Sequence, residues 1–317
     1  MLSQLLHGLR KIAPILARRF SWADRKWEDE FELAAVLFRI GLPQLALRMV
    51  QKRDIDSRYA FTNEDILLHL KERNWTMPTI RIVGELGNLV RVAIEDVEIY
   101  WPRKFDTSEL AWLWCEIFQP FDINPSSYAD PRIPFRDLPW VVDGGACEGF
   151  FTEFCRRKGV ASLLCVEMQP PLIEALKDTF IAQPNIVPIS GGLAATLGNA
   201  FIEEGQYICD AKLGQQLPDS PLEVQCVTLD YLQDVYDLKG KGLVKLDVEG
   251  AEMDVLSGAT NLLRDLKPYL AIAVYHGYDN AIRCAEIVRS ANPYYEVWFR
   301  GCYGYFDPPR PYIMFAA

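Results

Sequence analysis

The most distinctive chemical pattern in the sequence is an acid followed by closely spaced glycines. Asp143 ends the short apolar segment 139–143, and Gly144, Gly145 and Gly149 follow within the string DGGACEG. Such glycines permit positive φ and close approach of a ligand to the backbone before a helix begins. A dinucleotide site would carry GxGxxG instead, and an acid before the glycines repels phosphate. We therefore expect a cofactor with a cationic amino-acid group at this turn.

A second acid follows twenty-four residues later. The apolar segment 163–167 ends in Glu167. A carboxylate at the end of the second strand can accept hydrogen bonds from both hydroxyls of a ribose. A glutamate at a strand end is also commonly solvated. Its spacing from the glycine turn favours the ribose role, so we assign Glu167 to cofactor binding.

A third group of acids follows the segment 243–247, which ends in Asp247. Glu249 and Glu252 come next, at the start of a helical stretch, where capping of the helix is the alternative to a catalytic role. His276 follows a later apolar segment, with surface or core hydrogen bonding as its alternative. We predict that the group accepting a proton from a substrate is Asp247, Glu249 or His276.

These residues need a scaffold that brings their strand ends together. Short apolar segments alternate with helical ones through the second half of the chain, at residues 139–143, 163–167, 186–189, 243–247 and 269–275. This order predicts right-handed crossovers and a mostly parallel, Rossmann-like α/β sheet with ligands at its carboxyl edge. Segments 295–299 and 312–315 flank a Gly/Pro-rich turn, and we expect them to close the sheet as an antiparallel hairpin.

We divide the chain into three parts. Residues 1–78 form a helical N-terminal appendage, with Thr62 and Asp65 as a capping box. Residues 79–138 read as a β-meander and linker, and residues 139–317 as the cofactor-binding domain. Residues 1–20 are basic and could lie on an anionic membrane surface; the alternative is packing on the body of the protein or on a second subunit of a homo-oligomer.

Composition narrows the function further. The net charge of −10 argues against a nucleic-acid partner, because phosphate binding needs a basic surface. There is no apolar run long enough for a transmembrane helix and no secretory signal, so we expect a cytoplasmic protein. The eight cysteines show no CxxC pair and no zinc-ligand spacing, and we expect free thiols and no metal site. A divalent metal at Asp247 is a question that this pattern leaves open.

Four blocks in the second half of the chain together resemble the FkbM family of methyltransferases. They are the turn at 143–152, EMQP at 167–170, VTLDYL at 227–232, and KLDVEGAE at 245–252 followed by LSGA. The resemblance implies a class I methyltransferase sheet, S-adenosylmethionine as cofactor, and methylation of a hydroxyl on a sugar, polyketide or other small-molecule or glycan acceptor. The cofactor-binding residues that we predict are Asp143, Gly145, Gly149, Phe151, Thr152 and Glu167.

Two departures from other patterns bear on this interpretation. The family turn usually reads close to DVGANIG, whereas Gly144, Cys147 and Glu148 occupy three of its positions here. Enzymes that methylate amino groups resemble one another in an Asn/Asp-Pro-Pro-Tyr block after the fourth strand, where this chain has residues 247–250. Oxygen methylation is therefore our first prediction. The alternatives are a methyltransferase-like scaffold that binds without turnover and a nucleotide-dependent oxidoreductase, which the missing GxGxxG disfavours.

Overall fold

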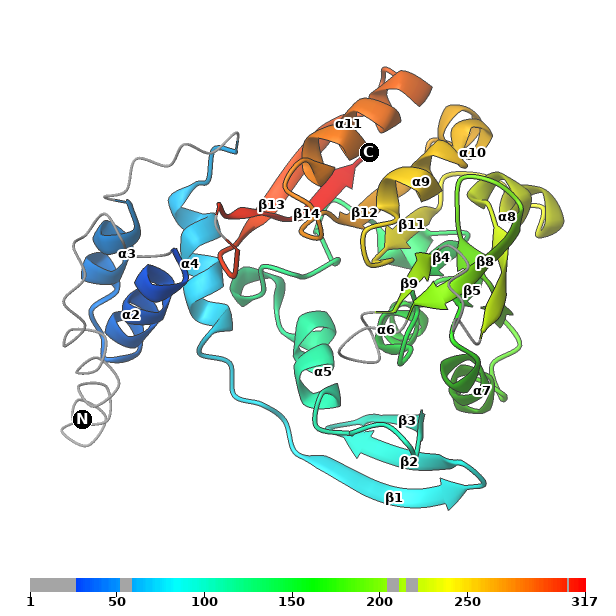
Figure 1. Ribbon diagram of the computed structural model, residues 1–317, viewed down its shortest axis with the longest axis horizontal. Helices are drawn as coiled ribbons and strands as arrows, with labels where there is room; N and C mark the ends of the chain where they lie inside the picture. The colour runs from blue at the N-terminus through cyan, green and yellow to red at the C-terminus, as the bar shows by residue number, and fades with distance from the viewer. Residues whose placement is uncertain (1–26, 52–58, 204–210, 215–221, 307) are drawn as a thin grey trace.

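The computed structural model describes residues 27–51, 59–203, 211–214, 222–306 and 308–317 (Figure 1). Its centre is a seven-stranded sheet in the order β13-β14-β12-β11-β4-β5-β6. The strands are β4 (Val141–Gly144), β5 (Leu163–Glu167), β6 (Ile186–Ser190), β11 (Leu243–Leu246), β12 (Tyr269–Ala273), β13 (Val297–Tyr303) and β14 (Arg310–Ala316). The first five run parallel, and β14 pairs antiparallel with both β12 and β13. The predicted fold class, including the antiparallel C-terminal hairpin, is confirmed.

The strand order reverses between β4 and β11. From β4 the chain moves outward through β5 to β6, then returns to place β11 on the other side of β4. In a parallel sheet this reversal opens a crevice at the carboxyl edge, because the connections on its two sides leave in opposite directions. The glycine turn after β4 and Asp247 after β11 therefore lie side by side, as Asp247 N donating to Gly144 O at 3.0 Å demonstrates.

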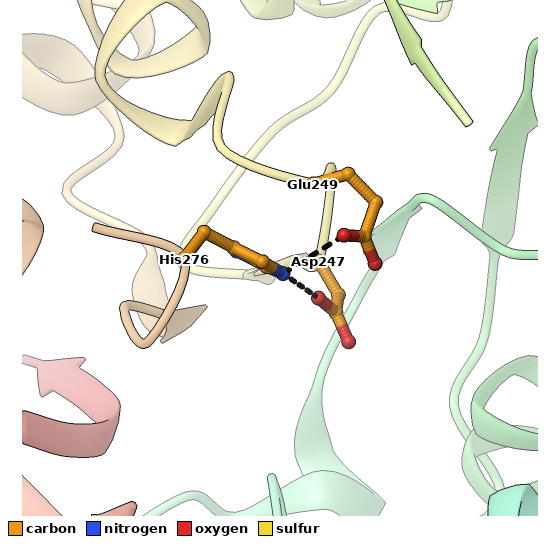
Figure 2. Close-up of side chains that lie close together, drawn as sticks. All are labelled: Asp247, Glu249 and His276. Atoms are coloured by element: carbon orange, nitrogen blue, oxygen red, sulfur yellow. Dashed lines mark ion pairs between the residues drawn. The ribbon is translucent and has the colours of Figure 1, made fainter. Parts of the chain in front are cut away.

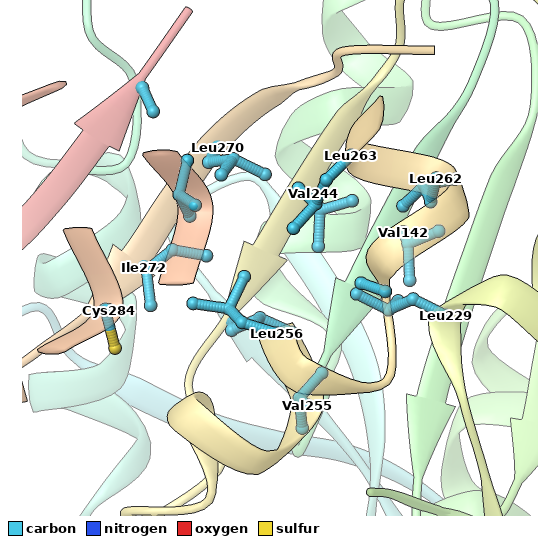
Figure 3. Close-up of a cluster of buried hydrophobic side chains, with 14 of the residues drawn as sticks. Val142, Leu229, Val244, Val255, Leu256, Leu262, Leu263, Leu270, Ile272 and Cys284 are labelled. Atoms are coloured by element: carbon cyan, nitrogen blue, oxygen red, sulfur yellow. The ribbon is translucent and has the colours of Figure 1, made fainter. Parts of the chain in front are cut away.

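Helices cover both faces of this sheet, and alternate residues of each strand face opposite layers. Val142, Val244 and Leu270 pack with α8 to α11 (Figure 3). Val141, Leu243 and Ala271 pack with α6 and α7 on the opposite face. The helices are α6 (Phe150–Lys158), α7 (Pro170–Thr179), α8 (Leu229–Val235), α9 (Glu252–Ser257), α10 (Thr260–Asp265) and α11 (Asn280–Ala291). Burial on both faces explains why these strands read as continuous apolar runs.

The last of the N-terminal helices packs on the hairpin edge of the sheet, and the other two pack on it (Figure 1). They are α2 (Trp27–Arg39), α3 (Pro43–Gln51) and α4 (Asn63–Glu72), and Thr62 with Asp65 forms the predicted capping box of α4. Asp65 also accepts a 2.9 Å hydrogen bond from Gly301 N in β13, and the buried Glu72 accepts one from Tyr312 in β14. The basic segment 1–20 lies outside the described residues. None of the described helices has the length and apolar character needed to cross a bilayer.

Two smaller sheets complete the architecture. The predicted meander is β1 (Ile80–Leu86), β2 (Leu89–Ile94) and β3 (Val97–Pro102), whose β3 lies against α7 through Tyr100 N donating to Thr179. It leads into α5 (Leu110–Phe118). The second sheet was not predicted and has the order β7-β10-β8-β9: β7 (Gly192–Leu193), β8 (Gly198–Glu203), β9 (Lys212–Gly214) and β10 (Glu223–Val227). It places apolar side chains beside the carboxyl edge of β5.

Candidate active site

A pocket with about 520 Å³ of open space lies at the carboxyl edge of β4, β5 and β11. Gly145 and Cys147 of the glycine turn, Glu167 of β5 and Asp247 after β11 line it together. The small second sheet contributes Leu193, Ala211 and Leu213, and Val166 adds a further apolar wall. This mixture of one apolar side and a few converging polar groups is typical of a cofactor pocket.

Glu167 is fixed in place by the backbone around it. Its Oε2 accepts from Cys147 N at 3.0 Å and its Oε1 from Gln169 N at 2.8 Å, so the glycine turn and the second strand end are joined directly. Burial raises the pKa of Glu167, although the backbone N–H groups of Gln169 and Cys147 act in the opposite direction. Each carboxylate oxygen keeps a lone pair for another donor, which suits the two hydroxyls of a ribose.

Gly145 serves the backbone as well as the pocket. Its φ is +72°, and a Cβ built there would overlap the backbone carbonyl oxygen of Asp247. Any side chain at this position would therefore displace the backbone that follows β11, whether or not the side chain entered the pocket. Gly149, with φ of +88°, is the N-cap residue before α6, and a Cβ there would press on the side chains of Leu176 and Phe180. Both glycines shape the turn, but only Gly145 lines the pocket.

Asp143 and Thr152 lie behind the pocket wall and line neither of the two pockets. Asp143 is opposite Lys245 in the β4/β11 register, and its Oδ1 is 3.0 Å from the buried Lys245 ammonium. Its other oxygen accepts from Thr152 Oγ1 at 2.7 Å. Lys245 also donates to the carbonyl of Gly145 at 2.8 Å. Burial by itself lowers the pKa of Lys245, but the charge of Asp143 outweighs it and raises that pKa. The pair thus supports the glycine turn from behind.

A second pocket, with about 590 Å³ of open space, adjoins the first. The two share four lining residues, Gly145, Cys147, Asp247 and Glu249. The rest of the second pocket includes aromatic rings and carboxyl groups, those of Tyr128, Phe151, Tyr275, Glu116 and Glu148, together with Lys245 and the aliphatic Leu113 and Ile117. Burial raises the pKa of Glu148 to about 7, and burial with the charge of Asp247 raises that of Glu116 well above its usual range.

Asp247, Glu249 and His276 converge at the boundary between the pockets (Figure 2). His276 Nε2 lies 3.3 Å from Glu249 Oε2 and 3.6 Å from Asp247 Oδ1. Asp247 Oδ2 accepts a 2.8 Å hydrogen bond from Tyr128 Oη, which directs its other oxygen toward the imidazole. The histidine side chain is only 6% exposed, whereas the two carboxylates are 27% and 19% exposed. The acids therefore face the pockets, and the ring lies behind them.

Glu252 holds the histidine from the other side. Its Oε1 accepts from Val248 N and Gly250 N, both at 3.2 Å, and lies 3.0 Å from His276 Nδ1. Burial lowers the pKa of His276, but Glu249 and Glu252 outweigh it and raise the pKa to about 10. Helix α9 has no side-chain cap hydrogen bond; the Glu252 side chain instead bonds the backbone of the preceding loop and lies against the ring.

The geometry brings Gly145, Glu167, Asp247 and Glu249 of the predicted set together in the first pocket, with Phe151 in the second and His276 behind them. Sequence reasoning did not assign roles to Tyr128, Glu148 and Lys245. Lys245 had a signal, because a lysine inside a buried apolar strand requires a carboxylate partner. Tyr128 had none, because it comes from an irregular segment 119 residues before Asp247.

Comparison with known proteins finds similarity to methyltransferases. Residues 143–291 match the family model of the methyltransferase FkbM domain. Methyltransferase 1 of Beauveria bassiana is 31% identical over 156 residues, which cover 39% of this chain and 60% of that protein. Hexuronic acid methyltransferase AglP of Haloferax volcanii is 24% identical over 144 residues, which cover 45% of this chain and 58% of that protein. The chain thus spans less than two thirds of the length of these two relatives.

Among solved structures, a methyltransferase FkbM from Methylobacillus flagellatus aligns with a TM-score of 0.43 at 15% identity. That alignment covers 68% of this chain and 56% of the other.

Proposed function

We propose that this chain, whose residues 143–291 match the family model of the methyltransferase FkbM domain, transfers a methyl group from S-adenosylmethionine to an acceptor hydroxyl. The resemblance to the FkbM family that the sequence predicted is confirmed, and S-adenosylmethionine is the cofactor that this assignment supports. The observation that carries the proposal is the pair of adjoining pockets, which share Asp247 and Glu249 at their boundary. A donor in one and an acceptor in the other would meet at these carboxylates.

We assign the first pocket to the cofactor. Glu167 has one free lone pair on each oxygen for the ribose hydroxyls, and Leu193, Leu213 and Val166 offer apolar surface for a purine. When bound, S-adenosylmethionine supplies an electrophilic methyl group and leaves as a neutral thioether. The glycine turn leaves backbone rather than side chain facing this space at Gly145. These residues bind and orient the donor, which is the main contribution a protein makes to a displacement of this kind.

We assign the second pocket to the acceptor. Carboxyl groups such as those of Glu116 and Glu148 form hydrogen bonds with hydroxyl groups, and rings such as Tyr128 and Tyr275 offer faces for a sugar or polyketide. Asp247 and Glu249 reach both pockets, so they are placed to orient the reacting hydroxyl and take its proton, while His276 positions them. A small hydroxyl-rich acceptor fits this acidic, aromatic pocket better than a phosphate-bearing one.

The proposal is tested in two steps. Calorimetric titration with S-adenosylmethionine, with NADH as a control ligand, measures donor binding. Incubation with S-adenosylmethionine and a panel of neutral glycosides, hexuronates and hydroxylated polyketides then measures S-adenosylhomocysteine release, and NMR locates the transferred methyl on oxygen, nitrogen or carbon. Absence of donor binding by folded protein overturns the function, and methylation on nitrogen or carbon overturns the choice of acceptor atom.

A further inference from the structure

The group formed by Asp247, Glu249 and His276 has the composition and spacing of a cation site. One ligand atom of each lies within 4.8 Å of those of the other two, and no other set of three such residues does so among the described residues. Figure 2 shows both carboxylates turned toward the same imidazole nitrogen. Neighbouring ligands of an octahedral ion with bonds of about 2.1 Å are about 3 Å apart. The separations of 3.3 Å and 3.6 Å from His276 Nε2 are close to that value.

The buried ring and one carboxylate oxygen lack regular hydrogen bonds. His276 is 94% buried by side-chain surface, and neither of its ring nitrogens makes a hydrogen bond of regular geometry with the described residues, although both lie near carboxylates. Asp247 Oδ1 is likewise buried and accepts no hydrogen bond there. Buried polar atoms that face one another at these distances without regular hydrogen bonds favour an ion as the group that satisfies them.

The surrounding contacts orient these groups as ligands. Glu252 is fully buried, is held by two backbone N–H groups, and faces His276 Nδ1, so it would keep the proton on Nδ1 when a cation displaces the proton of Nε2, whose lone pair would then face Asp247 and Glu249. A carboxylate behind a histidine is the usual support for a metal-binding imidazole. Tyr128 likewise supports Asp247, because its hydroxyl donates a hydrogen bond to Oδ2, the oxygen that does not face the imidazole. Glu249 is presented with φ of +54°, a backbone conformation that non-glycine residues adopt only seldom.

The charge balance also favours a cation. Three carboxylates, those of Asp247, Glu249 and Glu252, surround one imidazole, while the nearby Lys245 is paired with Asp143. Two carboxylates and one imidazole, with no thiolate, match Mn²⁺ and Mg²⁺ better than softer metals. We propose that Asp247, Glu249 and His276 bind a divalent cation of this class. Its open positions would face both pockets, and, resting on the proposed function, one of them would hold the acceptor hydroxyl beside the methyl group.

The experiment uses the full chain, stripped with EDTA and dialysed at pH 8, with MnCl₂ as the probe. Free Mn²⁺ is measured by electron paramagnetic resonance, and we expect one site with a dissociation constant below about 100 μM. Glu249→Gln should weaken binding at least tenfold, because it replaces a charged ligand at a half-buried position. Asp254→Asn is the matched control, since it removes a charge from an exposed position of the adjacent helix and should leave Mn²⁺ affinity unchanged.

Titration of the same EDTA-treated samples with S-adenosylhomocysteine keeps the two proposals apart. If the protein binds S-adenosylhomocysteine but no Mn²⁺, the cation site is overturned and the proposed function is left in place. A protonated His276 would then supply the positive charge beside Asp247 and Glu249. A Mn²⁺ site that is unchanged in Glu249→Gln also overturns the assignment. Mn²⁺ binding that is lost in Glu249→Gln and kept in Asp254→Asn supports the cation site. This holds even if S-adenosylhomocysteine does not bind and the proposed function is overturned.

Discussion

Replacing Glu167 by glutamine tests the cofactor pocket at its most informative residue. The two oxygens of Glu167 each accept one backbone N–H, from Cys147 and from Gln169. A glutamine in this place keeps the size of the side chain but has one oxygen and one NH₂ group. Whichever way the amide turns, a donor faces a backbone donor, and one ribose hydroxyl loses its acceptor.

The size of the effect follows from that count. A hydrogen bond to a charged group contributes about 1.5–3 kcal/mol, so the loss of one such bond to the ribose should raise the dissociation constant about 10- to 150-fold. Because burial raises the pKa of Glu167, removing its charge also relieves a desolvation cost in the free protein. We therefore expect the melting temperature to change by only a few degrees while affinity falls.

The assay is calorimetric titration with S-adenosylhomocysteine, with the melting temperature measured on the same samples. Glu174→Gln is the matched control, since it removes the same charge from an exposed position on the adjacent α7. The control should bind like the unmodified chain. If Glu167→Gln is folded and its affinity is within twofold of the control, Glu167 does not hold the ribose and the pocket assignment is wrong.

Three further predictions follow from the site. Asp247→Asn should lower the methylation rate about 10²- to 10⁴-fold in a steady-state assay while S-adenosylhomocysteine affinity stays within about twofold; an unchanged rate would remove Asp247 from the reaction. Gly145→Ala should lower the free energy of unfolding by about 2 kcal/mol or more in urea titrations, because its Cβ meets the Asp247 carbonyl. Gly159, with φ of +85° and no neighbour within 4 Å of a Cβ, is the control, and Gly159→Ala should lower that free energy by less. Equal losses in the two variants would contradict this reasoning. Burial raises the pKa of Glu148 from 4.5 to about 7, so the free energy of unfolding should fall by up to about 3 kcal/mol as the pH rises from about 4.5 through 7. The variant Glu148→Gln should therefore be more stable than the unmodified chain at pH 8 and equally stable near pH 4. Curves of unfolding free energy against pH that run parallel for the two proteins would refute this pKa assignment.

Much of the fold could be predicted from the sequence, because many strands and helix starts depend on the pattern of neighbouring residue types. The strands at 163–167 and 243–247 were identified from continuous apolar runs, which arise when both faces of a strand are buried. The capping box at Thr62 and Asp65 was identified from residue types three apart, which a helix start brings into contact. The small sheet of β7 to β10 was not identified, since its strands are short and its pairing joins segments about 25 residues apart. Its register is decided by packing against the core rather than by local sequence.

The candidate site also has a part that the sequence determined and a part that only the tertiary structure decided. The sequence by itself determined that Glu167 and Asp247 share one edge, because the carboxyl ends of parallel strands always do. It could not decide which acids face the pocket: Asp143 turns inward to Lys245, a partner 102 positions away that only the β4/β11 register supplies. Tyr128 and Asp247, and equally Glu252 and His276, meet through loops whose paths carry no periodic signal. Hydrogen bonds of this kind depend on distances of a few tenths of an ångström, which only the packed tertiary structure sets.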